Sequence, residues 1–362
     1  MKILHVITSL YTGGAERLMV ELLPLLCDKG QIQVELLLIN GVDTPFKKRI
    51  EECGIRVTAL SNTNDVYNVR NILRIRRFLK NNDYDIIHTH NTACQFYVPL
   101  SRLFLKKKHG VLVTTEHSLS NRRRNKWWLR PIDKWMYSKY ESIICIADES
   151  KRSLENYIGS YGKIRLICNG VDTRHFYRPI KDISNQNHFT ITMVAAIREE
   201  KDHETLFRAI AKLPNNYSLQ LVGGGEKDRV NALKNLCHEM ELDNRVTFMG
   251  VRMDVPDILE QSDVAVLSSH WEGFGLAAVE AMAAGRPLIA TDVGGLHDVV
   301  SGAGLLFPHG DDKALAEKIQ WLCEHPDEYR QIALKCQERA SKYDISIMAR
   351  KYLQLYERVI NR

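Results

Sequence analysis

A sequence of 362 residues, 44% hydrophobic and 26% charged, is too long for one ordinary core and fits two α/β domains of about 150–180 residues each. This composition excludes a disordered or fibrous protein. The net charge of +6 is unevenly spread, since residues 1–180 carry 29 Lys and Arg against 17 Asp and Glu whereas residues 181–362 carry 21 against 27.

The basic first half favours a partner that carries phosphate, or an anionic membrane surface, where each nearby Lys or Arg contributes about 1 kcal/mol. Nucleic acid is disfavoured because no recognition motif accompanies the charge. No apolar run approaches the roughly 18 residues of a spanning helix, and residues 1–14 are too short and too alternating for a signal peptide. We therefore expect a cytoplasmic protein, peripheral on the inner face of the membrane. Eight scattered cysteines without a C-x-x-C pair indicate reduced thiols.

Short apolar runs alternate with amphipathic helical stretches along the chain, which is the pattern of parallel βαβ units. The first series of predicted strands comprises residues 2–8, 34–40, 85–90, 111–116, 142–147 and 164–168. The second series comprises residues 189–196, 217–223, 245–250, 264–269, 287–291 and 304–307. A polar stretch at 169–189 is the predicted linker, and residues 345–362 have helical periodicity.

These elements predict an α/β fold of two Rossmann-like parallel-sheet domains that face each other across a cleft. The first domain covers residues 1–175 and the second covers 176–344. Residues 345–362 form a C-terminal helix that needs a surface to cover, and we expect it to pack back on the first domain.

The most informative segment is HWEGFGLAAVEAMAAGRPLIATDVGG, residues 270–295, which follows a predicted strand and opens a helix of small residues. Ligands of open α/β sheets bind at the carboxyl ends of strands. Gly273 and Gly275 allow close backbone approach, and the helix start favours a phosphate. Glu272 and Glu280 lie about two helical turns apart, so both can face one side and accept hydrogen bonds from sugar hydroxyls. Taken singly, the two residues also fit a helix-start acid and a solvated glutamate.

This segment resembles the donor-binding motif of the family-four retaining glycosyltransferases of the GT-B fold, the group that includes many bacterial polysaccharide and glycolipid enzymes. The resemblance covers nearly the whole chain. Its other motifs are GGAER at 13–17, DIIHTH at 85–90, TEHS at 115–118, KIRLICNGVDTRHF at 163–176, EEKDHETL at 199–206, LVGGGE at 221–226 and VTFMGVRMDVPDIL at 246–259. Each motif alone is weak, but their order and spacing together are specific.

The resemblance implies that Glu280 binds the ribose hydroxyls of a nucleotide sugar. It also implies that Glu272, with the backbone of Phe274, Gly275 and Leu276, holds the transferred sugar and the distal phosphate. The remaining donor-binding positions that it implies are Gly13, Gly14, Gly224 and Val251. Gly14 would lie against the donor phosphates, and two glycines between a strand and a helix do make an anion-sized notch.

Two cations are implied to neutralise the leaving diphosphate, a task that a metal ion performs in other transferases: Lys201 and Arg198. Family members often carry the arginine five positions before the lysine, where this chain has Ala196. Arg198 is therefore assigned the role from a shifted position. The alternative is a surface arginine paired with Glu199 or Glu200.

A histidine near the reacting centre is implied at His117, which matches the family residue that reaches the donor sugar. A neutral imidazole can donate or accept a hydrogen bond there. The alternative is a structural histidine at a strand end.

Three other patterns are weaker. The Asp-Tyr-Asp sequence at 83–85 matches a metal-binding D-x-D motif but introduces an apolar strand with no donor motif around it. His88 and His90 share a strand face and suit a metal pair, yet further ligands at a recognisable spacing are missing, which favours packing or substrate contact. The glycines at 223–225 lack the full dinucleotide fingerprint. We therefore predict no metal and no cofactor.

Two segments resemble membrane-interface helices in composition. Residues 121–140 interleave cations with tryptophan and tyrosine, and residues 69–80 form a basic amphipathic helix. Together they favour an acceptor on a lipid carrier at the inner membrane face. A solvated basic loop and an ordinary surface helix are the alternative.

The resulting prediction is a metal-independent retaining glycosyltransferase that moves a hexose or N-acetylhexosamine from a nucleotide diphosphate sugar, most commonly a UDP-sugar. The acceptor would be a saccharide or a polyprenyl-linked saccharide in cell-surface polysaccharide biosynthesis. Two alternatives stay open. A nucleotide-sugar epimerase would convert the donor without an acceptor, and a non-catalytic nucleotide-sugar-binding subunit would bind the donor without transferring it.

Overall fold

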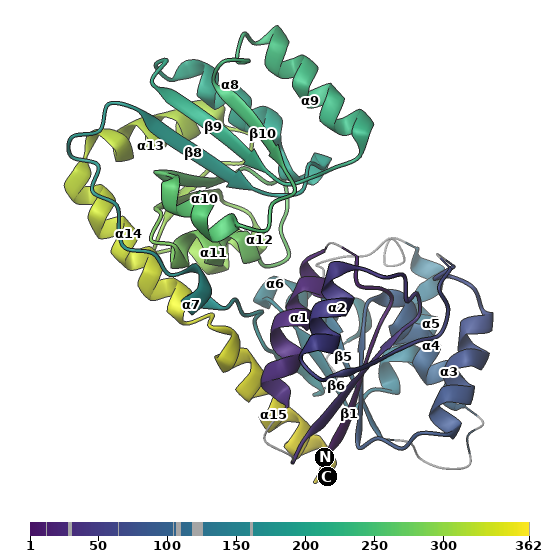
Figure 1. Ribbon diagram of the computed structural model, residues 1–362. Coiled ribbons are helices and arrows are strands. Elements are labelled where there is room, and N and C mark those ends of the chain that lie inside the picture. Colours follow the sequence, from purple (N-terminus) through teal and green to yellow (C-terminus); the bar gives the residue numbers. More distant parts are fainter. Residues whose placement is uncertain are drawn as a thin grey trace. The chain divides into compact units, whose positions relative to one another are not determined.

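The computed structural model describes residues 1–11, 13–27, 31–63, 65–103, 105, 110–117, 126–159 and 162–361. The chain divides into two compact units (Figure 1). The first unit comprises Met1–Gly170 and Ile345–Arg362, and the second comprises Val171–Asp344. The border therefore falls at residue 170, against a predicted border at residue 175, and the C-terminal segment belongs to the first unit.

The first unit is built on a seven-stranded parallel sheet with the strand order β3-β2-β1-β4-β5-β6-β7. Its strands are β1 (Lys2–Ile7), β2 (Gln33–Leu38), β3 (Arg56–Ala59), β4 (Ile86–His90), β5 (Val111–Glu116), β6 (Ser142–Cys145) and β7 (Ile164–Leu166). Of these, β3 was not predicted, because its four residues are only partly buried or exposed and show no apolar run.

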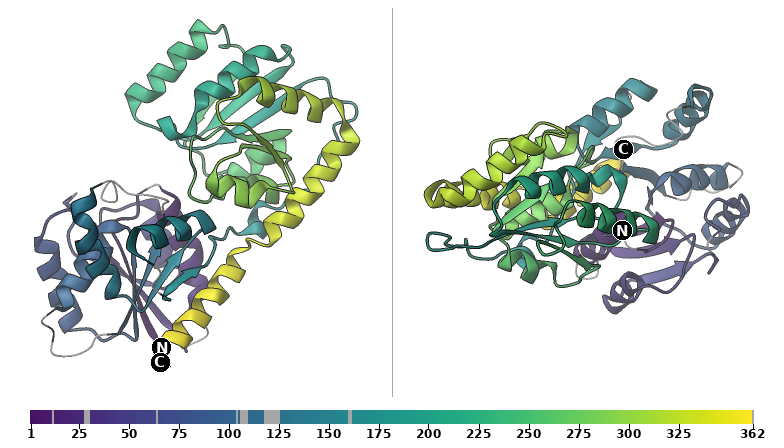
Figure 2. Two further views of the ribbon diagram at one scale, coloured as in Figure 1. Left: turned by 180° about the vertical axis from the view of Figure 1, so that it is seen from behind. Right: turned by 90° about the horizontal axis from the view of Figure 1, so that it is seen from above.

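Helices cover both faces of this sheet (Figure 2). They are α1 (Gly14–Leu26), α2 (Pro45–Glu52), α3 (Arg70–Lys80), α4 (Thr92–Arg102), the short 3₁₀ turn η1 (Trp127–Leu129), α5 (Arg130–Ser138), α6 (Asp148–Ile158) and α15 (Ile345–Ile360). Alternate residues of β1 serve the two faces: Ile3 and Ile7 join one hydrophobic cluster, while Leu4 and Val6 join the other.

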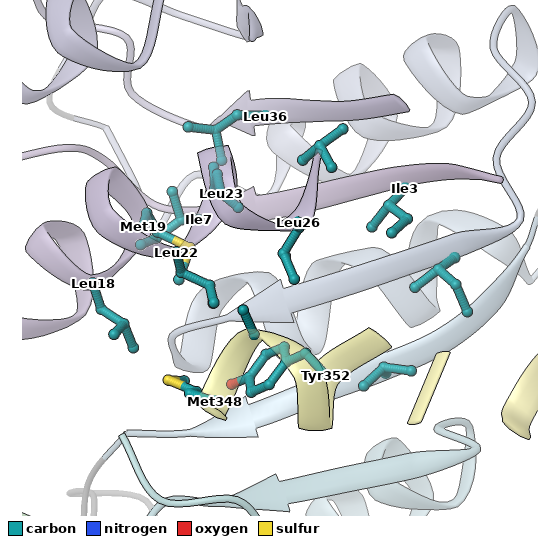
Figure 3. Packing of buried hydrophobic residues seen from close by; sticks show 14 of the residues in the cluster. Ile3, Ile7, Leu18, Met19, Leu22, Leu23, Leu26, Leu36, Met348 and Tyr352 are labelled. Carbon is teal, nitrogen blue, oxygen red and sulfur yellow. The ribbon is translucent and has the colours of Figure 1, made fainter. Parts of the chain in front are cut away.

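The helix α15 closes one of these faces. Its residues Met348 and Tyr352 lie in the same buried cluster as Leu18 and Leu22 of α1 (Figure 3). Residues spaced three or four apart along α15 are buried, which gives the apolar stripe that a helix needs to cover a sheet. The C-terminal segment is thus part of the core of the first unit, although 174 residues of the second unit separate it in sequence from Gly170.

The second unit is built on a six-stranded parallel sheet with the order β10-β9-β8-β11-β12-β13. Its strands are β8 (Phe189–Val194), β9 (Tyr217–Val222), β10 (Val246–Gly250), β11 (Val264–Leu267), β12 (Leu288–Thr291) and β13 (Leu305–Phe307). All six lie inside the second predicted series of strands. Of these, β11 and β12 are buried along their whole length, as expected for central strands covered on both faces.

The helical elements of the second unit are α7 (Thr173–Phe176), the 3₁₀ turn η2 (Glu199–Lys201), α8 (His203–Lys212), α9 (Lys227–Glu239), α10 (Val255–Gln261), α11 (Leu276–Ala283), α12 (Gly294–Val300), α13 (Asp312–Glu324) and α14 (Pro326–Ser341). Two parallel-sheet α/β units of this kind confirm the predicted fold class.

Candidate functional site

The residues predicted to bind a donor in the second unit follow the carboxyl ends of four neighbouring strands. Lys201 comes after β8, Gly224 after β9, Val251 directly after β10, and Glu272 after β11. These strands are adjacent in the order β10-β9-β8-β11. Because all are parallel, their following loops share one edge of the sheet, where ligands of open α/β sheets bind.

A tight turn leads from β11 into α11. Gly275, the residue before α11, has φ of 87°, a left-handed conformation that favours glycine, and a Cβ atom there would meet Leu296 at 2.7 Å. Gly295, at the start of α12, packs equally closely, because a Cβ atom on it would lie 2.7 Å from the carbonyl oxygens of Glu272 and Gly273. The turn is therefore held between two helix starts, whose backbone N–H groups favour an anion.

The ion pair between Lys201 and Glu272 joins two of the predicted catalytic residues. The Lys201 Nζ donates a hydrogen bond to the Glu272 Oε2. The two side chains are only 18% and 20% exposed. This pair places one cation and one carboxylate together at the sheet edge, which can bind a phosphate and sugar hydroxyls respectively.

Backbone contacts fix Lys201 in that place. The Ser268 hydroxyl, just after β11, donates to the carbonyl oxygens of Lys201 and Asp202 at 3.1 and 2.8 Å. Asp202 has φ of 47°, and its side chain accepts from the Thr205 N–H at 3.1 Å, which caps the helix α8. The N–H of His270 donates to the Glu200 carbonyl oxygen at 2.9 Å. The β8 loop and the β11 loop are thereby bound to each other on both sides of Lys201.

Arg198 differs from Lys201. Its side chain is 64% exposed and lies 3.7 Å from Glu200. This is the arrangement of the surface alternative, and at such exposure the pair contributes little stability. The role of Arg198 toward a donor phosphate stays a prediction.

Two other predicted positions, Gly224 and Val251, touch each other. A Cβ atom on Gly224 would lie 2.7 Å from the Val251 Cγ2, and Val251 is 66% exposed. The neighbouring Gly223 has φ of 150°, and a Cβ atom there would meet the Ala195 carbonyl oxygen at 2.0 Å. The glycine run therefore permits the close approach of the β8 and β9 loops.

The predicted ribose ligand Glu280 lies in α11 and is only 3% exposed. That burial does not fit a solvated surface glutamate. Phe274 is also buried and packs edge to face against Tyr343, with ring centroids 5.3 Å apart. Leu276, the first residue of α11, is partly exposed. The structure thus places these three side chains on one turn and its helix, beside Glu272.

The predicted residues of the first unit also follow the carboxyl ends of its strands. Gly13 and Gly14 lie after β1, where Gly13 is the residue before α1 and Gly14 begins it. A Cβ atom on Gly13 would lie 2.2 Å from the Glu16 carboxylate, so this position requires glycine unless Glu16 moves. His117 directly follows β5.

His117 belongs to a group of four histidines. Its Nε2 lies 3.0 Å from the His90 Nδ1, and the His90 Nε2 lies 2.9 Å from the His5 Nδ1. The His88 Nδ1 lies 2.6 Å from the Tyr356 hydroxyl. His5, His88 and His90 are fully buried, whereas His117 is partly exposed. Burial lowers the pKa of His5 to about 3 and the pKa of His117 to about 4.

His5 and His309 were missed by the sequence analysis. His5 lies opposite His88 in the register of β1 and β4, a pairing between distant segments that one sequence does not disclose. His309 lies 2.5 Å from the His270 Nδ1, which in turn lies 3.5 Å from Asp202. The ligand atoms of Asp202, His270 and His309 are within 4.8 Å of one another, so this group could hold a metal ion. Those of His5, His88 and His90 are equally close, but these ring nitrogens are engaged in hydrogen bonds.

The Asp-Tyr-Asp sequence at 83–85 directly precedes β4, so it lies at the amino ends of the parallel strands. The Asp85 Oδ2 accepts a hydrogen bond from the Lys2 N–H at 2.7 Å, and the Tyr84 hydroxyl donates to Glu35 at 2.7 Å. These residues thus stabilise the amino ends of β1 and β4, away from the strand ends that carry the donor-binding motifs.

The predicted membrane-facing segments are partly described. Residues 121–125 lie outside the described residues, but Trp127 and Trp128 are 81% and 56% exposed. Within α3, Ile75 and Leu79 are buried while Leu73 is exposed. Among the described helices, none is long and apolar enough to cross a lipid bilayer.

Two parallel-sheet α/β units with glycine turns at their strand ends have the architecture of the GT-B fold. The model of Glycosyltransferase Family 4 matches residues 12–175, and the model of Glycosyl transferases group 1 matches residues 178–340. The chain belongs to this family of glycosyltransferases, which confirms the resemblance found in the sequence.

Relatives and solved structures agree with this assignment. The putative glycosyltransferase EpsD of Bacillus subtilis (strain 168) is 27% identical over 81% of each chain. The UDP-Gal:alpha-D-GlcNAc-diphosphoundecaprenol alpha-1,3-galactosyltransferase of Escherichia coli is 28% identical over 87% of this chain and 89% of that one. The crystal structure of Anabaena Alr3699/HepE in complex with UDP has a TM-score of 0.85 at 23% identity, covering 99% of this chain and 100% of that one. This last likeness shows the fold.

Proposed function

We propose that the protein transfers a hexose or an N-acetylhexosamine from a UDP-sugar to a saccharide or a lipid-linked saccharide, with retention of anomeric configuration and without a metal ion. The product would enter cell-surface polysaccharide or glycolipid synthesis. The observation that carries the proposal is the Lys201–Glu272 pair beside the Gly275 turn at the carboxyl ends of β8 and β11.

The chemistry of that pair supports sugar transfer. A leaving diphosphate develops negative charge, which a partly buried Lys201 and the N–H groups at the start of α11 can stabilise. Glu272 would turn from Lys201 to the sugar hydroxyls when a donor binds. Glu280 would accept hydrogen bonds from the ribose. As the bond between the sugar and the diphosphate breaks, a departing phosphate oxygen would take the proton of the acceptor hydroxyl.

Two relatives support the choice of donor and acceptor. HepE was crystallised with UDP and with UDP-glucose. The Escherichia coli relative is named for a UDP-galactose donor and an acceptor on diphosphoundecaprenol. An acceptor on a lipid carrier would bring this protein to the inner face of the membrane, where the exposed Trp127 and Trp128 could lie at the interface.

A thermal-shift panel of nucleotide sugars tests the donor. A donor at about 100 times its dissociation constant adds roughly 2.7 kcal/mol of stability, so UDP-sugars should raise the melting temperature and GDP-sugars should not. The variant K201A should lose the shift. The matched control is K212A, because the Lys212 side chain is 47% exposed and pairs with Asp312 in the same unit.

A transfer assay with a lipid extract as acceptor then separates the functions. Transfer in the presence of EDTA, with retained configuration at the new linkage, supports the proposal. Conversion of the UDP-sugar to its epimer without an acceptor would establish the epimerase instead. Binding without transfer to any acceptor would establish the non-catalytic subunit.

A further inference from the structure

A single chain of hydrogen bonds connects the C-terminal helix α15 with His117. In order, it joins the Tyr352 hydroxyl, the Thr115 hydroxyl, His88, the Tyr356 hydroxyl, His5, His90 and His117. Its distances in the same order are 3.1, 2.8, 2.6, 3.5, 2.9 and 3.0 Å. The first six groups are fully buried, and only His117 is partly exposed.

All of these groups are neutral at pH 7. Burial lowers the pKa of each of the four histidines well below 7. Burial also raises the pKa of Tyr352 and of Tyr356 above its ordinary value. A neutral imidazole has one N–H donor and one acceptor nitrogen, and each hydroxyl has one O–H donor.

The number of donor hydrogens determines in which direction the hydrogen bonds of this chain point. Seven groups contribute seven donor hydrogens, but only six hydrogen bonds connect them, so one hydrogen is left without a partner in the chain. If it were left on Tyr352, Thr115 or Tyr356, a buried hydroxyl donor would be unpaired, which is strongly disfavoured. The left-over hydrogen therefore belongs on the Nδ1 of His117, because His117 is the one partly exposed residue among these seven.

We infer that the chain from α15 fixes His117 in the tautomer with hydrogen on Nδ1, so that His117 presents a hydrogen-bond donor to its ligand. The identity of this ligand rests on the proposed function: it is an oxygen atom of the donor sugar or of its phosphate. A neutral histidine locked in this state offers no lone pair at Nδ1. It therefore acts as a donor and does not remove a proton from the acceptor.

The same arrangement argues against a metal ion among His5, His88 and His90. The ring nitrogens of His5 and His90 that face each other are 2.9 Å apart, and their hydrogen bond uses the lone pair that a metal would need. Ligands of a tetrahedral zinc ion with bonds of about 2.0–2.1 Å lie about 3.3 Å apart. His5, His90, Tyr356 and Tyr352 are thus positioning residues, which act through His117.

The tautomer of His117 can be measured in the unliganded full chain labelled with [¹⁵N]histidine. Two-bond ¹H–¹⁵N correlation spectra distinguish a hydrogen on Nδ1 from one on Nε2, and the variant H117Q assigns the signal. We expect an excess of the Nδ1–H form of about tenfold or more, from the cost of one unpaired donor. A predominant Nε2–H form would overturn the inference.

Variants test whether α15 imposes this state. Y356F breaks the chain between His88 and His5, which leaves one buried nitrogen of His5 unpaired in either direction, so the Nε2–H form should become clearly populated. The matched control is Y140F, because Tyr140 is an equally buried tyrosine of the same unit whose hydroxyl bonds to the Gln95 carbonyl oxygen, outside the chain. T115V, which leaves the buried Nε2 of His88 unpaired in either direction, serves if Y356F does not fold.

An unchanged tautomer ratio in both folded variants would also overturn the inference. None of these measurements requires a sugar donor. If the Nδ1–H form is found and responds to Y356F while no UDP-sugar binds, the proposed function fails and the inference stands. If a UDP-sugar binds and is transferred while the Nε2–H form predominates, the inference fails and the proposed function stands, because donor binding and transfer are measured separately.

Discussion

At the scale of single residues, the pair formed by Lys201 and Glu272 is expected to matter for turnover more than for the fold. Removing one preorganised electrostatic partner of a transition state costs a factor of about 10²–10³ in kcat. We expect K201M and E272Q each to lower the turnover of a UDP-sugar by that order. Steady-state kinetics with UDP-glucose as the probe donor, together with melting temperatures, measure both effects.

The two effects can be separated. Each variant leaves one partner of a largely buried pair alone, which lowers stability as well. The double variant K201M/E272Q removes both charges and should recover stability without recovering turnover. If the double variant transferred sugar at the rate of the wild type, this pair would have no part in the reaction.

The conformation of Gly275 gives a second prediction at this scale. Alanine at φ of 87° costs about 1–2 kcal/mol by itself, and its Cβ atom would also meet Leu296 at 2.7 Å. Gly302 offers a control, since its φ is 77° but the nearest atom to an added Cβ is the flexible end of Arg339 at 3.6 Å. Urea unfolding should show G275A to be more destabilised than G302A. Equal losses would mean that the close packing of the β11 turn contributes nothing.

At the scale of elements, the histidines on β1, β4 and the end of β5 make the first unit sensitive to acid. Their folded pKa values are lowered, so the unfolded chain binds protons more readily than the folded chain. The free energy of unfolding is therefore highest above the unfolded pKa of about 6.5, and it falls as the pH drops toward about 3–4. Each buried histidine costs up to about 1.4 kcal/mol per pH unit in that window.

Urea unfolding between pH 7 and pH 5 measures this dependence. In the background W271F/W321F, the three remaining tryptophans belong to the first unit and report its unfolding by fluorescence. We expect H5Q to flatten the pH dependence and H238Q to leave it unchanged, because the His238 side chain is 82% exposed. A first unit equally stable at pH 5 and pH 7 would contradict the burial of neutral histidines.

The strands also show how much of the fold and of the site can be predicted from the sequence. The strand β11 is a continuous apolar run, and β8 alternates threonine with apolar residues, so the positions of both follow from the pattern of hydrophobicity. The edge strand β3 has no such run and was missed. The residues around Lys201 and Glu272 were found because family motifs follow predicted strands. The contact between them depends on the neighbouring positions of β8 and β11 in the sheet, which only the structure gives.

The hydrogen-bonded chain of histidines was harder to predict from the sequence. His88 and His90 share a strand face by their spacing, and the sequence indicated that much. Their connection to His5 on β1, and to Tyr352 and Tyr356 more than 260 residues away in the chain, depends on strand register and on the packing of α15. Such contacts between distant segments leave no local periodicity to detect.

At the scale of the whole molecule, the uneven charge between the two halves of the chain suits a membrane-bound acceptor. In the first unit, Trp127 and Trp128 are exposed beside Lys126 and Arg130, a combination that favours the interface of an anionic bilayer. We expect the protein to bind vesicles of phosphatidylglycerol and phosphatidylcholine, and W127A/W128A to weaken this binding about tenfold. Co-sedimentation with the vesicles measures it.

The control for this experiment is W321A, because Trp321 is 38% exposed and belongs to the second unit. Added salt should weaken binding by the wild type, since screening over a Debye length of about 8 Å reduces the attraction of the basic side chains. If W321A and W127A/W128A lost binding equally, the aromatic residues of the first unit would have no special role. If vesicle binding did not depend on salt, the basic charge of the first half would not be its cause. Support for a lipid-linked acceptor would then have to come from transfer assays.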